Sequence, residues 1–488
     1  MKKNIILAAL ALLVSSTTFA GGLLTNTNQN VAFLRNPARS AVIDIDGVYS
    51  NPAGIAFLPK GFYLSLNSQS AWQKREMISS APFYAFNTNG NGVTDKGLTY
   101  NKYVGTAQAP VIPSFQAAYV INDKWSVSAQ FAIGGGGGAC EFASGLPMFE
   151  QLVGGQMASA IAKSVPYSYS LNQNLIGEQY FYAVQLGATY KIGKKVSVFA
   201  GARGVIAQSG YKGEISNITV NGANASVYTV AMNQYAGLAT DYAAQAQAAA
   251  AAGNAAAAQQ LAAAAQAYAE GATAAGTAAY MMSDYSLDCQ QSGFGITPIL
   301  GIDVNLGRLN LAAKYEFRTK IEMTNKSNNS ANVDALMPDY ADGNKVRSDI
   351  PAIATLGAQY AVNNSVRLMG GFNYYFDKDA KGSATDVAKN TWEVTFGAEY
   401  DVNSWLTLSC GGQRTKFNFD EDMKDTNFNI SSLSVCMGAK ARLCKMLALN
   451  VGYMHSFYGD KVINRGNNIT DRYTRKSDAV GIGLDFKF

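Results

Sequence analysis

The sequence has little charge and no long apolar stretch beyond its first twenty residues. Asp, Glu, Lys and Arg make up 15% of its 488 residues, against about 25% in soluble domains. The longest strongly apolar run, residues 5–14, is much shorter than the roughly 20 residues that a membrane-spanning helix needs. These features exclude a helical membrane protein. The high apolar content, 48% of the chain, excludes a largely disordered one.

Cysteine and histidine are also scarce. The five cysteines are scattered, and neither they nor the single histidine, His455, form the ligand pattern of a metal centre. We therefore expect no metal and no cofactor. Cys140 and Cys289 fall in expected long loops, where they either form a disulfide or act as small buried apolar residues.

The first residues have the order of a secretory signal. Lys2 and Lys3 precede the apolar run, and Thr18, Phe19 and Ala20 form a small-residue cleavage pattern before Gly21. We interpret residues 1–20 as a signal peptide that is removed on export. The net charge of the whole chain is only +5, which argues against a nucleic-acid partner.

From residue 60 onward, apolar and polar residues alternate in segments of ten or more. In residues 309–324, for example, the odd positions are mostly apolar and the even positions mostly charged, so we expect the odd positions, Ile321 and Met323 among them, to face outward. A period of two places each set on its own face of a β-strand. Such segments are typical of transmembrane β-strands, although the signal in any one of them is weak.

Counting these segments gives fourteen expected strands, which are residues 62–75, 111–121, 125–134, 179–192, 196–212, 293–306, 309–324, 350–362, 365–377, 390–402, 405–419, 430–443, 447–459 and 473–488. Long and short connections alternate strictly between them. Outer-membrane barrels have this form, with short periplasmic turns and long extracellular loops, whereas a soluble sandwich has no reason to separate its loops in this way.

We therefore predict an all-β fold in which residues 60–488 form a 14-stranded antiparallel β-barrel in the outer membrane of a Gram-negative bacterium. The terminal Phe488 resembles the aromatic signal by which the barrel assembly machinery recognises its clients. Closure leaves no free sheet edge that demands a partner, so we expect a monomer surrounded by outer-membrane lipid.

Three segments lie outside the alternating pattern. Residues 21–59 contain three prolines and are too long to be a simple leader to the first strand, so we expect a hatch that plugs the barrel. Residues 147–164 indicate a short amphipathic helix. The Ala/Gln-rich residues 231–279, within the expected extracellular loop 213–292, indicate one or two helices because Ala is the strongest helix former. A poorly ordered insertion is the alternative.

The residues after the expected cleavage site carry the most specific motifs. They read Gly-Gly-Leu-Leu-Thr-Asn-Thr-Asn-Gln-Asn from Gly21, Ala-Phe-Leu-Arg-Asn-Pro-Ala-Arg from Ala32, and Gly-Val-Tyr-Ser-Asn-Pro-Ala-Gly from Gly47. This region resembles the hatch of FadL-type long-chain fatty-acid and hydrophobic-compound transporters, especially their Bacteroidetes-like branch. Asn51, Pro52 and Ala53 match the family's Asn-Pro-Ala motif just before the first strand. The Ala/Gln-rich insertion departs from the family pattern.

The resemblance implies passive uptake of long-chain fatty acids or similar hydrophobic molecules. Ligand would be captured among the extracellular loops, pass to a pocket in the barrel, and leave sideways through the wall after the hatch shifts. Candidate hatch and gating residues are Asn36, Pro37, Asn51, Pro52 and Ala53. The family's lateral opening is associated with the third strand. This strand ends here in a glycine run that permits a bulge or kink, or alternatively forms a flexible loop tip: Gly134, Gly135, Gly136, Gly137 and Gly138.

The two-residue repeat of the strands places further candidate ligand-binding residues on the inward face of the barrel wall. The cations are Arg203, Lys314 and Arg318, and their inward apolar partners are Phe181, Phe199, Met369 and Tyr375. A carboxylate head group can pair with Arg203 or Arg318. Alternatively, these cations pair with inward acids such as Glu316 or with the hatch.

Three other functions fit parts of the sequence. A general diffusion porin explains the polar inward faces but not a hatch. An outer-membrane lipid hydrolase would need a histidine base for its nucleophile. His455 has the parity of lipid-facing residues, so we expect an interfacial polar residue there and no enzyme. An adhesive role of the Ala/Gln-rich loop is the third alternative.

Overall fold

The computed structural model describes residues 24–89, 93–95, 98–163, 166–382, 388–419 and 428–488. The expected signal peptide lies outside these residues. No helix in the described ranges is long and apolar enough to cross a bilayer.

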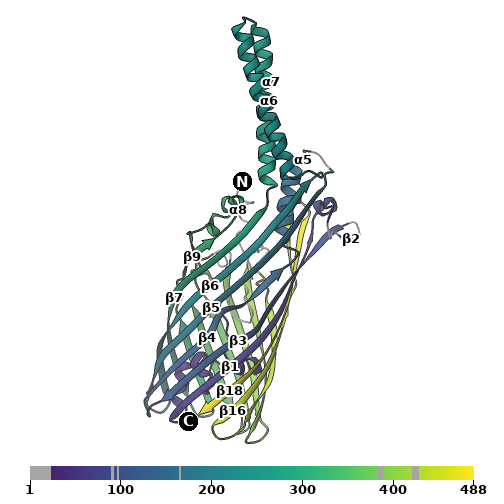
Figure 1. Cartoon of the computed structure of the whole chain (residues 1–488). Coiled ribbons are helices and arrows are strands. Elements are labelled where there is room, and N and C mark those ends of the chain that lie inside the picture. The colour runs from purple at the N-terminus through teal and green to yellow at the C-terminus, as the bar shows by residue number, and fades with distance from the viewer. Residues whose placement is uncertain (1–23, 90–92, 96–97, 164–165, 383–387, 420–427) are drawn as a thin grey trace.

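The described strands form one closed antiparallel sheet (Figure 1). They are β1 (Gly61–Ser80), β2 (Val93–Asp95), β3 (Leu98–Val120), β4 (Trp125–Phe142), β5 (Tyr169–Ile192), β6 (Val196–Val220), β7 (Tyr285–Asn305), β8 (Leu309–Glu316), β9 (Glu322–Ser327), β10 (Lys345–Arg347), β11 (Ile353–Ala361), β12 (Val366–Tyr375), β13 (Ala388–Asp401), β14 (Leu406–Phe419), β15 (Ser432–Arg442), β16 (Leu447–Tyr458), β17 (Lys461–Gly466) and β18 (Ile469–Lys487). Three pairs, β8 with β9, β10 with β11 and β16 with β17, each make one strand of the wall, and β2 only extends a hairpin with β3. The wall therefore has fourteen strands, as predicted.

The seam of the barrel joins β1 to β18. The two strands pair without interruption from Tyr63 opposite Lys487 to Ser80 opposite Thr470. Pairing around the whole circumference satisfies the backbone polar groups that lipid cannot.

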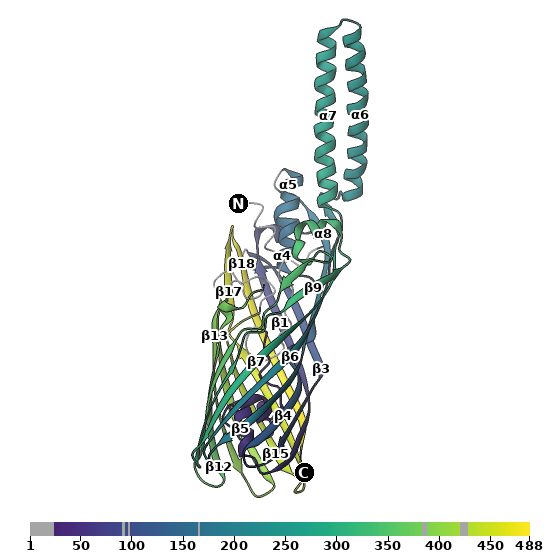
Figure 2. The ribbon, with the colours of Figure 1, turned by 90° about the vertical axis from the view of Figure 1, so that its left-hand side faces the viewer.

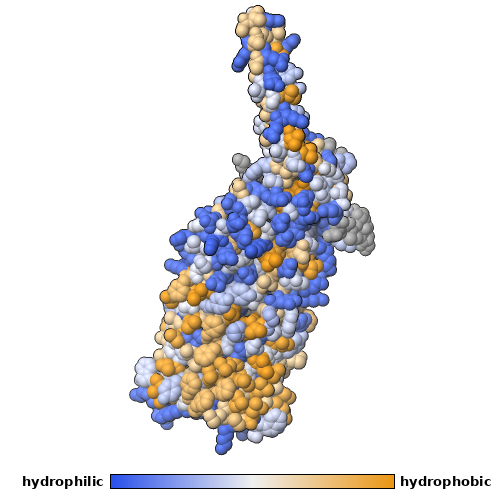
Figure 3. All heavy atoms as spheres, viewed as in Figure 1, coloured by the Kyte–Doolittle hydropathy of each residue, from blue (hydrophilic) through white to orange (hydrophobic). Residues whose placement is uncertain are grey.

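Side chains alternate between the two faces of the wall. On β1, Leu66 and Trp72 are exposed on the outside, while Ser65 and Gln69 are buried inside. In Figure 3 the outward apolar residues gather in a belt over the lower part of the barrel, and the upper part is hydrophilic. A closed sheet with such a belt is the form of an outer-membrane barrel.

The short turns lie at the lower end of the barrel, near the C-terminus (Figure 2). Asn122, Asn363 and Asn403 each accept hydrogen bonds from backbone N–H groups two and three residues ahead, at 2.8–3.0 Å. These Asx turns are what the sequence predicts for tight connections.

Helices occupy both ends of the barrel. The short elements α2 (Val31–Arg35), α3 (Gly47–Ser50) and η1 (Pro52–Phe57) lie inside its lower part (Figure 2). The long loops contribute η2 (Pro82–Phe86), α4 (Pro147–Glu150), η3 (Gln151–Met157), α5 (Ala158–Ala162), α8 (Ala331–Leu336), η4 (Pro338–Tyr340) and η5 (Asp377–Asp379). The Ala/Gln-rich stretch forms two antiparallel helices, α6 (Ala225–Ala251) and α7 (Ala255–Met281), which project from the upper end.

A large apolar cluster fills the upper end of the barrel. It joins the upper strands to the loop helices through residues such as Phe83, Phe142, Phe149, Tyr169 and Tyr473. Cys140 and Cys289 belong to this cluster, and all five thiols are free. Of the two roles considered for Cys140 and Cys289, the buried apolar one is found.

One expected strand is interrupted. Residues 309–324 do not run continuously, because β8 ends at Glu316 and β9 begins at Glu322. Ala312, Lys314 and Glu316 are buried before the break, whereas Thr319, Ile321 and Met323 are buried after it. The inward parity therefore changes from even to odd, and the prediction that Ile321 and Met323 face outward is wrong. The intervening residues do not follow the two-residue repeat of an extended strand.

The upper ends of several strands are longer than predicted. β3 begins at Leu98 rather than residue 111, β6 continues to Val220, and β7 begins at Tyr285. The expected loop 213–292 is correspondingly shorter. These extensions lie above the apolar belt, where the outward face is polar and alternation is weak.

The helical hairpin is expected to be dispensable for the barrel, because most of α6 and α7 is exposed and β6 pairs with β7 below it up to Ile215 and Tyr285. Replacing residues 229–277 by a four-residue Gly-Asn turn should leave barrel assembly intact. Heat-modifiable migration on gels checks this. Loss of the compact, heat-sensitive form would show that the hairpin is needed for assembly.

Candidate functional site

The N-terminal segment inside the barrel, residues 24–59, which we call the hatch, is built from short capped helices. Asn30 caps α2 by accepting a hydrogen bond from the Ala32 N–H at 2.7 Å. Asn51 caps η1 by accepting from the Gly54 N–H, with Pro52 at the first helical position. These helices are too short to be stable alone, so their shape depends on the wall around them.

Ion pairs tie the hatch to one side of the barrel. Glu399 on β13 accepts hydrogen bonds through one oxygen from Arg35 at 2.6 Å and from Arg39 at 2.8 Å. Arg39 also makes a two-pronged contact with Asp46 within the hatch. All four side chains are buried. Because a charge left alone in such a site is costly, the hatch and β13 depend on one another.

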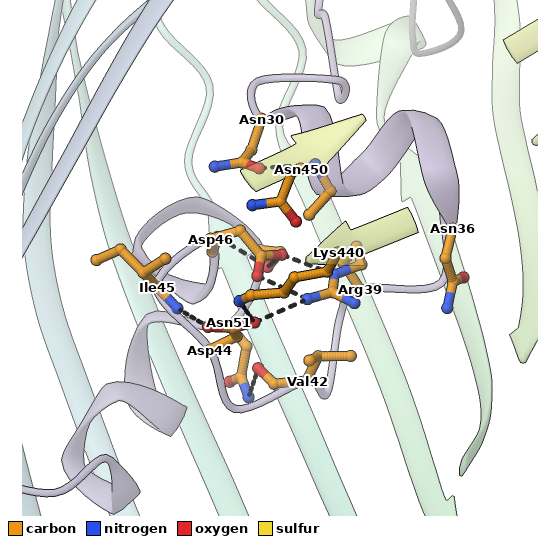
Figure 4. Close-up of polar contacts among 12 residues, drawn as sticks. Asn30, Asn36, Arg39, Val42, Asp44, Ile45, Asp46, Asn51, Lys440 and Asn450 are labelled. Carbon is orange, nitrogen blue, oxygen red and sulfur yellow. Dashed lines mark hydrogen bonds and ion pairs between the residues drawn. The ribbon is translucent and has the colours of Figure 1, made fainter. Parts of the chain in front are cut away.

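A second ion pair lies next to the first (Figure 4). Lys440 on β15 contacts Asp44 of the hatch at 2.7 Å and Asp485 on β18 at 3.0 Å. Burial raises the pKa of Asp44, but Lys440 and Arg39 lower it by more, so its net shift is downward. The stabilisation from this carboxylate is therefore present at neutral pH and is lost only as pH falls through its lowered pKa.

The first Asn-Pro pair of the hatch fits against glycines of the wall. Asn36 donates to the Met369 sulfur at 3.4 Å and accepts from the Ala38 N–H at 3.0 Å. A Cβ placed on Gly397 would come within 1.9 Å of the Asn36 oxygen, and one on Gly411 within 2.8 Å of the Pro37 ring. Glycine is therefore required for this close approach.

The second Asn-Pro pair is held by hydrogen bonds on the opposite wall strands. Asn51 donates to Asp303 on β7 at 2.5 Å. The carbonyl oxygen of Pro52 accepts from Thr189 on β5 at 2.8 Å, and that of Ala53 from Ser197 on β6 at 2.7 Å. The two candidate gating motifs thus contact different sides of the barrel.

The structure brings together two of the three predicted lumen cations. Glu316 lies between Arg203, at 2.6 Å, and Lys314, at 2.7 Å, and all three are buried. Lys314 also donates to the Tyr49 carbonyl oxygen of the hatch at 2.7 Å, and the Tyr49 ring lies beneath both cations. Glu316 therefore pairs with both cations, and the cluster supports the hatch through Tyr49. Next to it remains a cavity of only about 30 Å³.

The other predicted lumen residues are distributed differently. Phe199 packs on Ala53, and Met369 packs on Ala38 and Val42, so both contact the hatch. Phe181 packs on Leu24, and Tyr375 is buried beside Glu393. Arg318 does not join Arg203 and Lys314. It lies in the interruption after β8, half-buried, 3.8 Å from Asp349.

The wall is interrupted at the predicted glycine run. β3 and β4 pair up to Ser114 opposite Ala132 and resume only at Gln108 opposite Ala139. Gly136 and Gly137 have φ angles of 67° and 113°, a region that favours glycine. Pro110 and Pro113 on β3 lie in the same interval, where β3 has no partner residues on β4, and proline, which lacks an N–H, suits such positions.

Asn26 of the hatch binds β4 where β3 does not. Its backbone N–H donates to the Gly134 carbonyl oxygen at 2.8 Å. Its side-chain amide donates to the carbonyl oxygens of Ile133 at 3.2 Å and Gly136 at 2.8 Å. The first described residues of the hatch therefore substitute for part of the sheet ladder.

Several of these residues were not singled out from the sequence. Arg35, Arg39 and Asn26 lie within the hatch motif, and the two-residue repeat already placed Glu399 on the inward face, but no local signal pairs residues 360 or more positions apart. Two buried arginines of the upper lumen, Arg75 and Arg475, also have inward parity and lie opposite each other on β1 and β18. Arg475 donates to the Phe428 carbonyl oxygen at 3.2 Å, and the Arg75 guanidinium lies 5.5 Å from the centre of the Phe428 ring.

Glu399→Gln should loosen the hatch, because it leaves Arg35 and Arg39 without their shared carboxylate. Removing one partner of a buried pair costs about 3–5 kcal/mol. We expect faster proteolysis of residues 24–59 and higher ion conductance in planar bilayers. Glu322→Gln, which removes an exposed partner of Lys345, is the control. Equal conductance and proteolysis in the two variants would contradict the assignment.

Gly397→Ala tests the close approach of Asn36. Its added methyl group would collide with the Asn36 amide, whereas at Gly370, also in the wall, the nearest heavy atom is 3.8 Å from the added carbon. We expect G397A, but not G370A, to destabilise the hatch by about 1–3 kcal/mol. Hydrogen exchange of the hatch amides measures this difference. Similar protection in both variants would show that the hatch is not seated on this glycine.

Comparison with solved structures identifies the fold. The chain is similar to a FadL homologue of Pseudomonas aeruginosa, with a TM-score of 0.61, 12% identity, and coverage of 96% of this chain and 100% of that one. It is also similar to the toluene transporter TodX of P. putida (TM-score 0.52, 14% identity, 92% and 95% covered). A third similar structure is the Ralstonia pickettii toluene transporter TbuX (0.52, 13%, 94% and 97%).

No protein-family model and no curated protein matched the sequence. The Bacteroidetes-like branch thus stays a prediction. What the structural similarity shows is that the chain has the FadL-type fold, a 14-stranded outer-membrane barrel.

Proposed function

We propose that this protein takes up hydrophobic molecules passively across the outer membrane. Ligand enters the apolar upper end, the hatch moves, and ligand leaves sideways between β3 and β4. The observation that carries the proposal is Asn26, because the same residue belongs to the hatch and completes the interrupted wall at Gly134 and Gly136. Displacing the start of the hatch would release this part of β4.

The contents of the barrel support this route. The upper end is packed with Phe, Tyr and Met side chains, which suit apolar cargo at about 0.8 kcal/mol for each buried CH₂ group. The hatch at the lower end is held by ion pairs and hydrogen bonds as well as by small apolar clusters. A filled bore of this kind does not suit a general diffusion porin, which has a water-filled channel.

The buried cations of the lumen bear on which hydrophobic molecules the protein carries. Arg203 and Lys314 already share Glu316, so we place a role for them in supporting the hatch. An acidic ligand that enters from the upper end would pass Arg75 and Arg475, two buried cations that contact Phe428. We therefore include long-chain carboxylates, as well as neutral hydrocarbons, among the molecules carried.

An enzymatic role has less support. His455 lies on the outer face, with its ring nitrogen 2.7 Å from Asp478, but the adjacent Ser456 points to the interior and is buried. The pair therefore lacks the serine nucleophile that the sequence places beside it. The protein named in each comparison is a transporter or transporter homologue, and we infer a transport function without catalysis.

Reconstitution in liposomes tests the proposal. Radiolabelled oleate and toluene should enter or cross vesicles containing the protein faster than protein-free vesicles, while sugars should cause no rapid swelling. Rapid sugar flux would favour a porin. Absence of oleate and toluene transfer would contradict hydrophobic uptake.

Asn26→Ala tests the link between hatch and wall. The variant removes the two side-chain hydrogen bonds to the carbonyl oxygens of β4, so amides near residues 133–138 should exchange faster. Oleate or toluene transfer should rise as well. Asn254→Ala, at the tip of the helical hairpin, is the control. Faster exchange without any change in transfer would contradict the proposed exit between β3 and β4.

A further inference from the structure

A pocket of about 540 Å³ lies on the wall outside the transport path. It lies at the break between β16 and β17, and residues of the neighbouring strands β18 and β1 complete its lining. Its lining includes Lys74, Glu76, Phe457, Asp460 and Lys476. Neither the hatch nor the interruption between β3 and β4 contributes to it.

The pocket lies at the upper edge of the apolar belt. On β1, the outward Phe62 and Trp72 are ten residues apart, which is about 33 Å along a strand. At a tilt of roughly 40° this corresponds to about 25 Å across the membrane, the height of a barrel's apolar band. Lys74, the next outward residue, is therefore at the level of the lipid head groups of the outer leaflet.

Two lysines face each other at this level. Lys74 on β1 is directly opposite Lys476 on β18, and both are exposed. Like charges directly opposite each other destabilise a sheet. In the part of the chain that the structure describes, no carboxylate lies within ion-pair distance of Lys476. An anion bound between the two ammonium groups would remove their repulsion.

The nearby acids already have partners. Glu76 contacts Lys102 at 2.7 Å and Lys74 at 3.5 Å. Asp460 binds Arg472. Asp478 accepts from Tyr453 and contacts His455, each at 2.7 Å. A third cation of the lining, Arg475, is only 6% exposed and donates to the Phe428 carbonyl oxygen on the inner side of the wall.

Apolar side chains adjoin the lysines. Phe457 on β16 is opposite Lys476, and Trp72 lies two positions below Lys74 on the outward face. A ligand seated here would have its charge between the lysines and its hydrocarbon against the belt. This combination suits a membrane lipid better than a free anion.

We propose that this pocket binds an outer-leaflet lipid through a phosphate monoester. Such a group carries a charge of about −1.5 to −2 at neutral pH, which matches two lysines better than the single charge of a phosphodiester. The phosphate lies between Lys74 and Lys476, and the acyl chains lie along Phe457 and Trp72. The site shares only the buried Arg475 with the upper lumen, and it does not depend on the proposed function.

Titration of the purified barrel with diphosphoryl lipid A, followed by native mass spectrometry, tests the proposal. The wild-type protein should bind one molecule with saturation, and should bind dephosphorylated lipid A and phosphatidylethanolamine at least about tenfold more weakly. The double variant K74Q/K476Q should bind diphosphoryl lipid A about tenfold more weakly than the wild type does. Glu76→Gln should bind more tightly, because it removes a competing carboxylate.

The matched control is K212Q/K345Q, which also removes two exposed lysines, on β6 and β10. It should bind lipid A as the wild type does. Equal affinity of the wild type for phosphorylated and dephosphorylated lipid A would overturn the proposal, as would unchanged binding by K74Q/K476Q. The comparison of phosphorylated and dephosphorylated lipids needs only the wild-type protein. It therefore tests the proposed phosphate site even if the double variant does not assemble.

Discussion

The constraint on which this structure depends is that backbone polar groups in a membrane need partners within the protein. Closure of β1 on β18 meets this need around most of the wall. Between β3 and β4 the ladder stops, and carbonyl oxygens of Ile133, Gly134 and Gly136 are paired with Asn26 instead. The hatch is thus part of the hydrogen-bonding system of the wall as well as an obstruction of the bore.

The two ends of the lumen differ in their polar contacts, because apolar packing occurs at both ends but the buried ion pairs between hatch and wall lie at the lower end. The upper end packs apolar side chains from several loops, an arrangement with little directional preference that can accommodate apolar ligands. The lower end uses geometrically specific ion pairs and hydrogen bonds, such as those of Arg35, Arg39 and Glu399. The apolar cluster, which can adapt to different ligands, thus lies at the end where a ligand would enter. The specific ion pairs lie where the hatch must close the bore again.

The sequence was most informative where lipid imposes a two-residue repeat. It predicted the fourteen wall strands, the short connections between them, and the inward direction of Arg203 and Lys314. It failed at residues 317–321, because Phe317, Thr319 and Ile321 are acceptable on either face and hide the change of parity. It also missed the upper ends of β3 and β6, where water replaces lipid, the outward face is polar, and the apolar residues face the interior. The ion pair of Arg39 with Glu399 forms only because the fold brings the two residues together. A local sequence pattern contains no information on such a contact.

The seam between β1 and β18 has a consequence for the order of assembly. Residues near position 63 meet residues near position 487, so the cylinder cannot be sealed until synthesis and export have delivered β18. The hatch precedes β1 and ends up enclosed, with its ion pairs on β13 and β15 formed by strands made much later. During biogenesis the hatch must therefore enter the curved, still open sheet before β18 pairs with β1. We expect an intermediate in which this seam is open and chaperones bind the chain, because the pairing of strands distant in sequence is slow.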